Sequence, residues 1–464
     1  MTFLVDQLSA FSPITTYGKV HRIVGLVVEG SCPRSSIGSL CEIAPLEEGA
    51  ATVPAEIVGY SNNRALLMPL GELRGLGPGS RIRVRKGQAT IGVGDALLGR
   101  VLDGMGAPLD QGPPIYLPQE KPLYSLPPDP MRRDAITKPL DLGIRAINGL
   151  LTCGIGQRMG IMAGSGVGKS VLLGMMAKFA KADVNVIALI GERGREVKEF
   201  IDRDLGPEGL AHSVIVAVTS DQSPLLRMRG AFVATAIAEY FCQQGKDVLL
   251  MMDSITRFAM AMREIGLSIG EPPTTKGYTP SVFATLPKLL ERAGNFQDQG
   301  SITGLYTVLV DGDDLTEPVA DSVRSILDGH IVLSRAIAAK NHYPAIDVML
   351  STSRVMRDIT SQRHRKLAGK LRSVLAVYQE SEDLINIGAY AAGSNKKIDY
   401  AVSRIDAINS FLIQSYDESS TFEESVAALG DLVSDRQAAD RRRAGRPGFD
   451  RRKGDRLEAE DSDE

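Results

Sequence analysis

One stretch of the sequence combines the residue types and the spacing that bind phosphate groups. It consists of eight consecutive residues: Ala163, Gly164, Ser165, Gly166, Val167, Gly168, Lys169 and Ser170. The stretch follows a short apolar run, 159–162, and opens a helix that we expect to begin near Val171. Glycines let successive backbone N–H groups converge on phosphate oxygens, and the helix N-terminus adds its positive dipole. Lys169 would then reach the β- and γ-phosphates of a nucleotide, and the Ser170 hydroxyl would bind Mg²⁺.

A carboxylate that completes the magnesium site is expected at the end of a neighbouring strand. Asp253 is the first polar residue after the apolar run 248–252, and it follows the phosphate loop in chain order. This position fits a carboxylate that holds Mg²⁺ through water. One residue departs from the usual pattern of the loop. Ala163 stands where glycine is usual, and its methyl group fits only if its φ is negative.

Hydrolysis also needs a group that positions the attacking water. Glu192 follows the apolar run 184–190, where its carboxylate would polarise water in line with the γ-phosphate. The alternative interpretation is a carboxylate at a helix N-terminus, which favours that end of the helix dipole. Glu196 fits this alternative better than Glu192 does.

The elements that must position these residues form an α/β core with two flanking domains. Continuous apolar runs separated by helical stretches indicate a mostly parallel sheet that is buried on both faces. These runs lie at 184–190, 213–219, 247–252, 302–310 and 331–333. From Gly18 to about residue 90, short alternating strands between Gly-rich turns predict a small N-terminal β-barrel. After residue 350 the polar–apolar stretches 359–378 and 397–413 predict a C-terminal helical domain.

We place the boundaries as a docking segment at 1–17, a β-barrel at 18–92, a P-loop ATPase domain at 93–350, a helical domain at 351–437 and a disordered charged tail at 438–464. In the first segment, Leu4, Leu8 and Phe11 share one helical face, and two interpretations stay open. The face either packs on its own domain or docks a partner. The tail carries charges of both signs and almost nothing apolar, so burial cannot offset the entropy of ordering it.

Composition indicates a cytoplasmic protein. The four cysteines, at 32, 41, 153 and 242, are dispersed and are expected to be reduced core thiols, and no apolar run is long enough to span a bilayer. The net charge is −3, and tryptophan is absent, so nucleic acid is not an expected partner. The basic alternation at 81–86 is expected to be a solvated strand face.

Several motifs together resemble the family that contains the catalytic subunit of rotary ATP synthases and the type III export ATPases. The resemblance runs from the barrel to about residue 435. It rests on the phosphate loop and on the segments 191–193, 252–254, 343–347 and 351–354. Within the family, residues 280–294 and 311–318 are similar to the export ATPases and not to the synthase subunits. Residues 386–390 resemble the flagellar members most. Asn148 stands where family members usually carry Asp.

The resemblance implies ATP hydrolysis coupled to export of unfolded proteins through a flagellar type III secretion apparatus. It implies that Glu192 is the catalytic carboxylate and that Arg193 is a phosphate neighbour. It also implies that Tyr343 stacks on adenine, and that Arg354 is an arginine finger in the site of the next subunit. The expected assembly is a homo-hexamer at the inner face of the membrane export gate. Expected partners are export substrates, their chaperones, and regulator or stator proteins at the N-terminal segment.

Three other kinds of ATPase-like protein share parts of this pattern. A virulence-type injectisome ATPase shares every catalytic motif. An RNA-translocating hexamer would show aromatic and basic residues together on the barrel, but residues 1–90 contain only four aromatic residues, at positions 3, 11, 17 and 60. A non-catalytic regulatory subunit would lack the catalytic carboxylate, and Glu192 is present.

Overall fold

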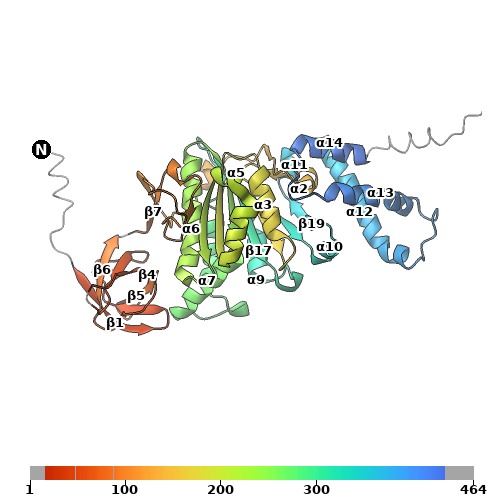
Figure 1. Cartoon of the computed structure of the whole chain (residues 1–464). Helices are drawn as coiled ribbons and strands as arrows, with labels where there is room; N and C mark the ends of the chain where they lie inside the picture. The colour runs from red at the N-terminus through yellow and green to blue at the C-terminus, as the bar shows by residue number, and fades with distance from the viewer. Residues whose placement is uncertain (1–15, 48, 87, 434–464) are drawn as a thin grey trace, which may run out of the picture.

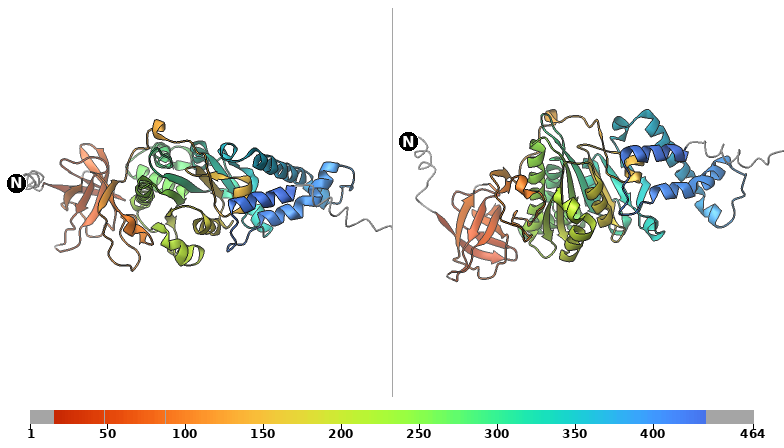
Figure 2. Two further views of the ribbon diagram at one scale, coloured as in Figure 1. Left: turned by 90° about the horizontal axis from the view of Figure 1, so that it is seen from above. Right: turned by 45° about the horizontal axis from the view of Figure 1, so that its top comes forward.

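The computed structural model describes residues 16–47, 49–86 and 88–433, arranged in a row of three parts (Figures 1 and 2). The first part is a closed barrel with the strand order β1-β2-β5-β4-β3-β6. Its strands are β1 (Tyr17–Val24), β2 (Val27–Gly30), β3 (Leu40–Ile43), β4 (Val53–Ser61), β5 (Arg64–Pro69) and β6 (Arg81–Lys86). Closure leaves no unpaired strand edge. The predicted N-terminal barrel is therefore confirmed.

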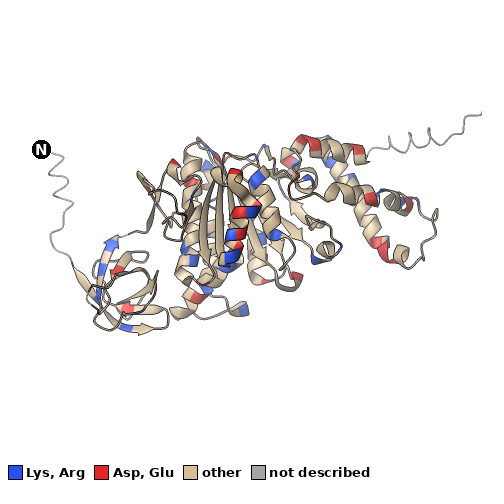
Figure 3. Ribbon diagram, viewed as in Figure 1, with Lys and Arg blue, Asp and Glu red and all other residues tan. Residues whose placement is uncertain are grey.

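The second part is a central sheet in which every strand of the main path is parallel to its neighbours except the edge strand β19. Its order is β19 (Ile346–Ser353), β18 (Gly329–Leu333), β12 (Arg158–Ala163), β17 (Ser301–Leu309), β15 (Asp247–Asp253), β13 (Val184–Glu192), β14 (Ser213–Thr219) and β8 (Val101–Leu102). The short strand β16 (Gly294–Asn295) pairs with β17. Charged side chains are sparse along these strands (Figure 3). The predicted mostly parallel sheet is confirmed.

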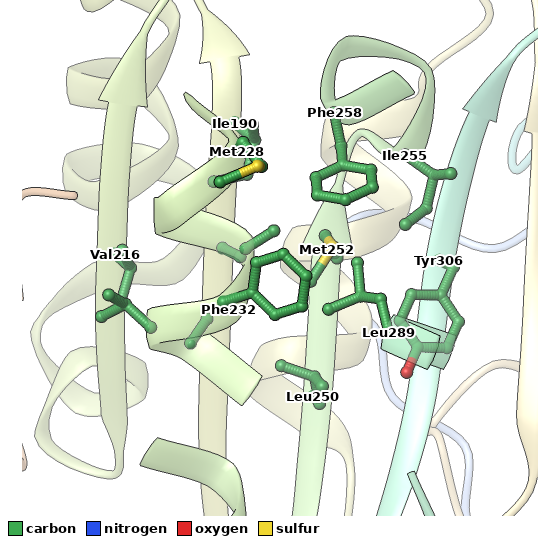
Figure 4. Packing of buried hydrophobic residues seen from close by; sticks show 14 of the residues in the cluster. Ile190, Val216, Met228, Phe232, Leu250, Met252, Ile255, Phe258, Leu289 and Tyr306 are labelled. Atoms are coloured by element: carbon green, nitrogen blue, oxygen red, sulfur yellow. The ribbon is translucent and has the colours of Figure 1, made fainter. Parts of the chain in front are cut away.

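Helices cover both faces of this sheet, and alternate residues along each strand point toward opposite faces. On β13, Val186 and Ile190 pack with α6 (Pro224–Gln243) and α7 (Ile255–Ser268), while Ile187 and Leu189 pack with α3 (Lys169–Phe179). Figure 4 shows the first of these layers, in which Phe232 of α6 and Phe258 of α7 meet with ring centroids 5.9 Å apart. The continuous apolar runs therefore reflect burial on both faces.

The remaining elements of the central part connect and flank the sheet. The connector from the barrel includes a separate two-stranded sheet, formed by β7 (Thr90–Val93) and β9 (Gln119–Pro122). Other short elements are η1 (Asp95–Leu97), η2 (Pro130–Arg132), β10 (Pro139–Leu140), β11 (Cys153–Gly154), α4 (Gly194–Glu199), the π-helical turn η3 (Phe200–Leu205), α5 (Gly206–Ala211), η4 (Thr275–Gly277), α8 (Pro280–Leu290), η5 (Asp311–Asp313), α9 (Pro318–Ile326) and α10 (Arg335–Ala339).

The third part is helical, as predicted. It contains α11 (Met356–Ile359), α12 (Gln362–Asn386), α13 (Lys396–Leu412) and α14 (Phe422–Val433). The last three of these helices pack on α2 (Arg145–Leu150) of the central part. The first of its long helices extends eight residues beyond the predicted stretch 359–378. Among the described residues, none of the helices combines the length and apolar composition that crossing a bilayer requires. The predicted N-terminal helix and the whole of the charged tail lie outside the described residues, and the domain boundaries stay predictions.

A buried ion pair joins the barrel to the central part. Glu56 on β4 and Arg229 on α6 are 3% and 1% exposed, and the Arg229 Nη1 lies 3.1 Å from the Glu56 Oε2. The Tyr124 hydroxyl donates to the other carboxylate oxygen at 2.7 Å. Burial raises the pKa of Glu56, and the hydrogen bond from Tyr124 and the charge of Arg229 oppose that rise. Removing one partner would leave the other charged and buried.

Substituting Glu56→Ala is therefore expected to destabilise the protein by about 3–5 kcal/mol, because the Arg229 guanidinium would stay buried without a counter-charge. The double variant Glu56→Ala/Arg229→Met should recover most of that loss, since both charges are then gone. Thermal unfolding of the single and double variants measures this coupling. The exposed pair of Arg22 and Glu29 provides a control, because Glu29→Ala should shift the melting temperature much less. Equal shifts for Glu56→Ala and Glu29→Ala would contradict the expectation.

Candidate functional site

The phosphate loop lies between β12 and α3, at the carboxyl edge of the central sheet. Ala163 is the last residue of β12 and is fully buried, and it is not among the residues with positive φ. Its extended backbone explains why alanine is tolerated there. Gly166 and Gly168 have φ of 77° and 86°, a left-handed region that favours glycine. The helix begins at Lys169, two residues earlier than expected, because left-handed Gly168 ends the loop directly before it.

Lys169 is held between two carboxylates at this edge. Its Nζ lies 2.5 Å from the Asp253 Oδ1 and 3.4 Å from the Glu192 Oε1. The same Asp253 oxygen accepts a hydrogen bond from the Thr307 hydroxyl at 2.7 Å. Burial lowers the pKa of Lys169, but the charges of Asp253 and Glu192 outweigh burial and leave that pKa raised. The ammonium is therefore charged. Its nearest partners are Asp253, which the sequence predicts to hold Mg²⁺, and Glu192, which it predicts to position the attacking water.

Glu192 is placed by an irregularity at the end of β13. The register with β14 shifts between Ile190 and Glu192, and Gly191 between them has a φ of 73°. The Glu192 carbonyl accepts from the Ser220 N–H at 3.0 Å, which fixes the backbone. Burial first, and then the charge of Asp253, raise the pKa of Glu192, while Lys169 opposes the rise. A carboxylate with a raised pKa beside a phosphate site is suited to orient and polarise water.

The charged residues Arg193 and Glu196 follow Glu192 closely in the chain, and Glu196 forms a side-chain hydrogen bond with Glu192. The side chain of Arg193 is 79% exposed, and its Nη1 pairs with the Glu196 Oε1 at 3.2 Å. Glu196 lies in the first turn of α4, as expected for a carboxylate at a helix N-terminus. The structure therefore does not bring Arg193 to Lys169 or Asp253, and its role as a phosphate neighbour stays a prediction. Ser165 and Ser170 are exposed at the mouth of the loop.

Tyr343 lies beside the phosphate loop although 173 residues separate it from Ser170. A Cβ atom added to Gly168 would stand 3.4 Å from the ring atoms Cδ1 and Cε1 of Tyr343. The residue is 41% exposed, so part of it is accessible to a ligand. A ring at this position is suited to stack on the base of a nucleotide whose phosphates occupy the loop.

Arg354 lies at the opposite edge of the sheet. Its backbone N–H donates to the Asp328 carbonyl at 2.9 Å, and Asp328 in turn donates to the carbonyl of Arg158, the first residue of β12. The phosphate loop follows the last residue of β12. Six strand residues span about 17 Å, which is more than an arginine side chain reaches. Arg354 therefore does not reach the phosphate loop of its own chain.

Sequence reasoning missed Arg257, which the structure places at the site. A Cβ atom added to Gly191 would stand 2.8 Å from the Arg257 Cβ, so this arginine packs against the residue before Glu192. Its Nε is buried without a hydrogen bond, and among the described residues it forms no ion pair. The available signal was its place in the first turn of α7, where a positive charge opposes the helix dipole. The Arg257 Nη1 donates to the Met260 Sδ at 3.7 Å. A guanidinium that has no ion-pair partner among the described residues, on a side chain that packs against the residue before Glu192, is suited to a phosphate anion.

The donor set at this edge fits a magnesium nucleotide. A hydroxyl at Ser170 and a carboxylate at Asp253 are hard oxygen ligands of the kind that Mg²⁺ accepts together with phosphate oxygens. The described residues contain no group of three or more His, Cys, Asp or Glu side chains that would hold a metal ion without a nucleotide. A metal bound here would therefore share its coordination with the substrate.

Asn148, which departs from the pattern of the family, has a structural explanation. It is fully buried, and its Nδ2 donates to the Asp141 Oδ1 at 2.8 Å and to the Ser420 carbonyl at 3.0 Å. An aspartate could not donate these bonds unless it were protonated. Asparagine therefore satisfies both acceptors without placing a second buried carboxylate beside Asp141.

Comparison with known proteins agrees with this site. Residues 143–353 match the family described as ATP synthase alpha/beta family, nucleotide-binding domain, and residues 360–431 match the family described as T3SS EscN ATPase C-terminal domain. A flagellum-specific ATP synthase of Bacillus subtilis is 52% identical over 437 residues, covering 94% of this chain and 99% of the relative. A type 3 secretion system ATPase of Xanthomonas euvesicatoria is 50% identical over 434 residues, covering 94% and 98%.

Solved structures give the same result. The assembled ATPase EscN of the enteropathogenic E. coli type III secretion system has a TM-score of 0.85 and 46% identity, covering 90% of this chain and 100% of that chain. The same ATPase in complex with its central stalk EscO has a TM-score of 0.83 at the same identity and coverage. The match over nearly all of the chain, with a phosphate loop and two carboxylates in place, shows that this chain is an ATPase of the ATP synthase alpha/beta family and belongs with the flagellum-specific ATP synthases and the type 3 secretion system ATPases.

Proposed function

We propose that this chain hydrolyses ATP to drive protein export through a flagellar type III secretion apparatus. The observation that carries the proposal is the placement of the Lys169 ammonium between Asp253 and Glu192 at the end of a phosphate loop. In the free enzyme this ion pair holds the two carboxylates in place beside the phosphate loop. When a nucleotide binds, its phosphates provide Lys169 with an alternative anionic partner, and Glu192 is left to act on water.

In this mechanism the loop amides, Lys169 and Arg257 bind the phosphates. Glu192 holds the attacking water by accepting a hydrogen bond from it while the phosphoryl group is transferred. Ser170 and Asp253 would hold Mg²⁺, which neutralises charge on the β- and γ-phosphates when it is bound. Thr307 keeps Asp253 oriented through the bond to its Oδ1. Tyr343 contacts the adenine.

The position of Arg354 supports a site between subunits in a homo-hexamer. The guanidinium lies a full strand length from its own phosphate loop, so it can serve only a neighbouring loop. A charge supplied across a boundary stabilises the transferring phosphoryl group and makes turnover depend on assembly. The relative EscN has been seen as an assembled ATPase, which supports the same arrangement here.

The cellular assignment rests on the relatives. Several of the similar proteins are named flagellum-specific ATP synthases, while a type 3 secretion system ATPase of nearly equal identity keeps the injectisome as the alternative. We propose a cytoplasmic enzyme at the inner face of the membrane export gate, which handles export substrates and their chaperones. Residues 1–17 would contact regulator or stator proteins. The relative EscN has been seen in complex with another protein, its central stalk EscO, which supports protein partners in general. Restoration of motility in a flagellated strain that lacks its own export ATPase would support the flagellar assignment over the injectisome.

Glu192→Gln should separate nucleotide binding from chemistry. The amide keeps the shape of the carboxylate but loses the charge that polarises water, so ATP should still bind while kcat falls by roughly 10²–10⁴-fold. Single-turnover hydrolysis and ATP binding, measured on the same preparation, check this expectation. Glu196→Gln provides the matched control and should retain most of the activity. If Glu196→Gln were the inactive variant, the catalytic role would belong to Glu196.

Arg257→Ala should weaken nucleotide binding through the phosphates. Loss of a charged hydrogen-bond donor to an anion is expected to lower the affinity for ADP by roughly tenfold to a hundredfold. The melting temperature of the free protein should hardly change, because this guanidinium has no ion-pair partner among the described residues. Arg203→Ala is the control, since the Arg203 side chain is 68% exposed and pairs with the neighbouring Asp204. Unchanged ADP affinity in Arg257→Ala would remove this arginine from the site.

Arg354→Ala should lower kcat by roughly 10³–10⁵-fold, as for other arginine fingers, and leave ATP affinity nearly unchanged. Mixing Arg354→Ala chains with Lys169→Ala chains should partly restore activity, because some interfaces then pair an intact loop with an intact finger. Mixing Arg354→Ala with the double variant Arg354→Ala/Lys169→Ala is the control, since no interface contains a finger. If the first mixture co-assembles and stays inactive, Arg354 does not act between subunits.

A further inference from the structure

A buried glutamine joins the C-terminal helical part to the base side of the nucleotide site. Gln414 lies just after α13 and is 3% exposed. Its backbone N–H donates to the carbonyl oxygen of Tyr343 at 2.9 Å. Tyr343 in turn lies against Gly168 of the phosphate loop. The peptide that carries the proposed adenine contact is therefore held by a residue from another part of the chain.

The side chain of Gln414 is fixed as firmly as its backbone. Its Oε1 accepts from the backbone N–H of Arg145 at 2.8 Å. Its Nε2 donates to the carbonyl oxygens of Gly143 and Glu418, at 2.7 Å and 2.8 Å. One backbone donor and two carbonyl acceptors allow only one orientation of the amide. In the reverse orientation the amide oxygen would face the two carbonyl oxygens, and no hydrogen bond could form there. Because the side chain is buried and its amide oxygen and nitrogen are both hydrogen-bonded, breaking these bonds costs free energy.

The segment that Gln414 contacts is also tied to the phosphate-loop helix. A Cβ atom added to Gly143 would stand 2.4 Å from the Phe179 Cβ, so Gly143 packs on the last turn of α3. The Gly143 carbonyl accepts a second hydrogen bond, from the Ser420 N–H at 3.0 Å. Asn148 donates to the Ser420 carbonyl. Hydrogen bonds of two buried side-chain amides, Gln414 at one end and Asn148 at the other, therefore hold residues 414–420 on the ATPase domain.

We infer that Gln414 is a positioning residue that sets the base side of the nucleotide site and makes it depend on how the C-terminal helical part is seated. The inference rests on the proposed function, in which Tyr343 contacts adenine. Gln414 makes no hydrogen bond to Lys169, Asp253 or Glu192, whose contacts come from the sheet. The Gly143 contact on α3 is with Phe179, at the opposite end of that helix from the phosphate loop. Gln414 therefore acts on recognition of the base and leaves recognition of the phosphates to the loop.

Binding of ADP and of inorganic triphosphate to the full-length chain, each with Mg²⁺, separates these two sides. In Gln414→Glu a carboxylate oxygen would face the carbonyls of Gly143 and Glu418 in place of a donor. ADP affinity should fall about tenfold or more, and KM for ATP should rise to a similar extent. Triphosphate affinity and kcat should stay within about twofold of wild type, because the phosphate contacts are unchanged.

Gln379→Glu is the matched control, since it makes the same charge change at an exposed position of α12 and should alter neither affinity. Gln414→Met keeps the length of the side chain and removes the donors, and it serves the same test if Gln414→Glu unfolds. Equal loss of ADP and triphosphate affinity would overturn the inference, as would unchanged ADP affinity in the folded variants. Tyr343→Ala distinguishes the two claims: if it weakens ADP binding and the Gln414 variants do not, only the positioning role is wrong. If it leaves ADP binding unchanged, the proposed adenine contact is wrong as well.

Discussion

The site depends on one electrostatic arrangement, in which a single ammonium holds together a buried carboxylate, Asp253, and a half-buried one, Glu192. Asp253 and Glu192 end neighbouring parallel strands, so their like charges meet at one edge of the sheet. Two carboxylates in this place repel each other, and burial adds to the cost of their charge. Lys169 offsets both effects from the loop that begins α3. An arrangement of this kind is stable only while a cation lies between the carboxylates, which is why nucleotide, metal and lysine are linked in the proposed mechanism.

The parallel sheet makes that arrangement possible. Its strands are buried on both faces by two helical layers, which keeps the strand ends in register with one another. The register shift beside Gly191 then turns Glu192 toward the lysine at the end of a strand whose other residues are apolar. Arg257 packs against the same glycine, so one left-handed residue positions both a carboxylate and a guanidinium.

The three parts of the chain are coupled to this core by buried polar contacts that would be costly to break. Glu56 and Arg229 connect the barrel to α6, the helix that packs on the strand of Glu192. Gln414 and Asn148 connect the C-terminal helices to the phosphate-loop helix and to Tyr343. Partners that contact the barrel or the C-terminal helices would therefore act on elements that are linked to the nucleotide site. Such links are consistent with an ATPase whose turnover responds to assembly.

Local pattern was sufficient to predict much of this protein. The phosphate loop, the strand ends at Asp253 and Glu192, the buried parallel sheet, the barrel and the helical C-terminal part all follow from short-range spacing of glycine, apolar and charged residues. Side-chain period and turn chemistry act over a few residues, so they are visible in a single sequence. The resemblance to a family added Tyr343 and Arg354, which spacing alone did not distinguish from surface residues.

Only the tertiary structure decided the remainder. It placed Tyr343 against Gly168, separated Arg354 from its own loop by the length of β12, and turned Arg193 out to Glu196. It also brought Arg257 to the site and explained Asn148 and Gln414, whose side-chain partners lie up to 272 residues away for Asn148 and up to 271 residues away for Gln414. These contacts join residues from distant parts of the chain. No local pattern encodes them, because a side chain acquires its hydrogen-bond partners and its burial only when the layers pack together.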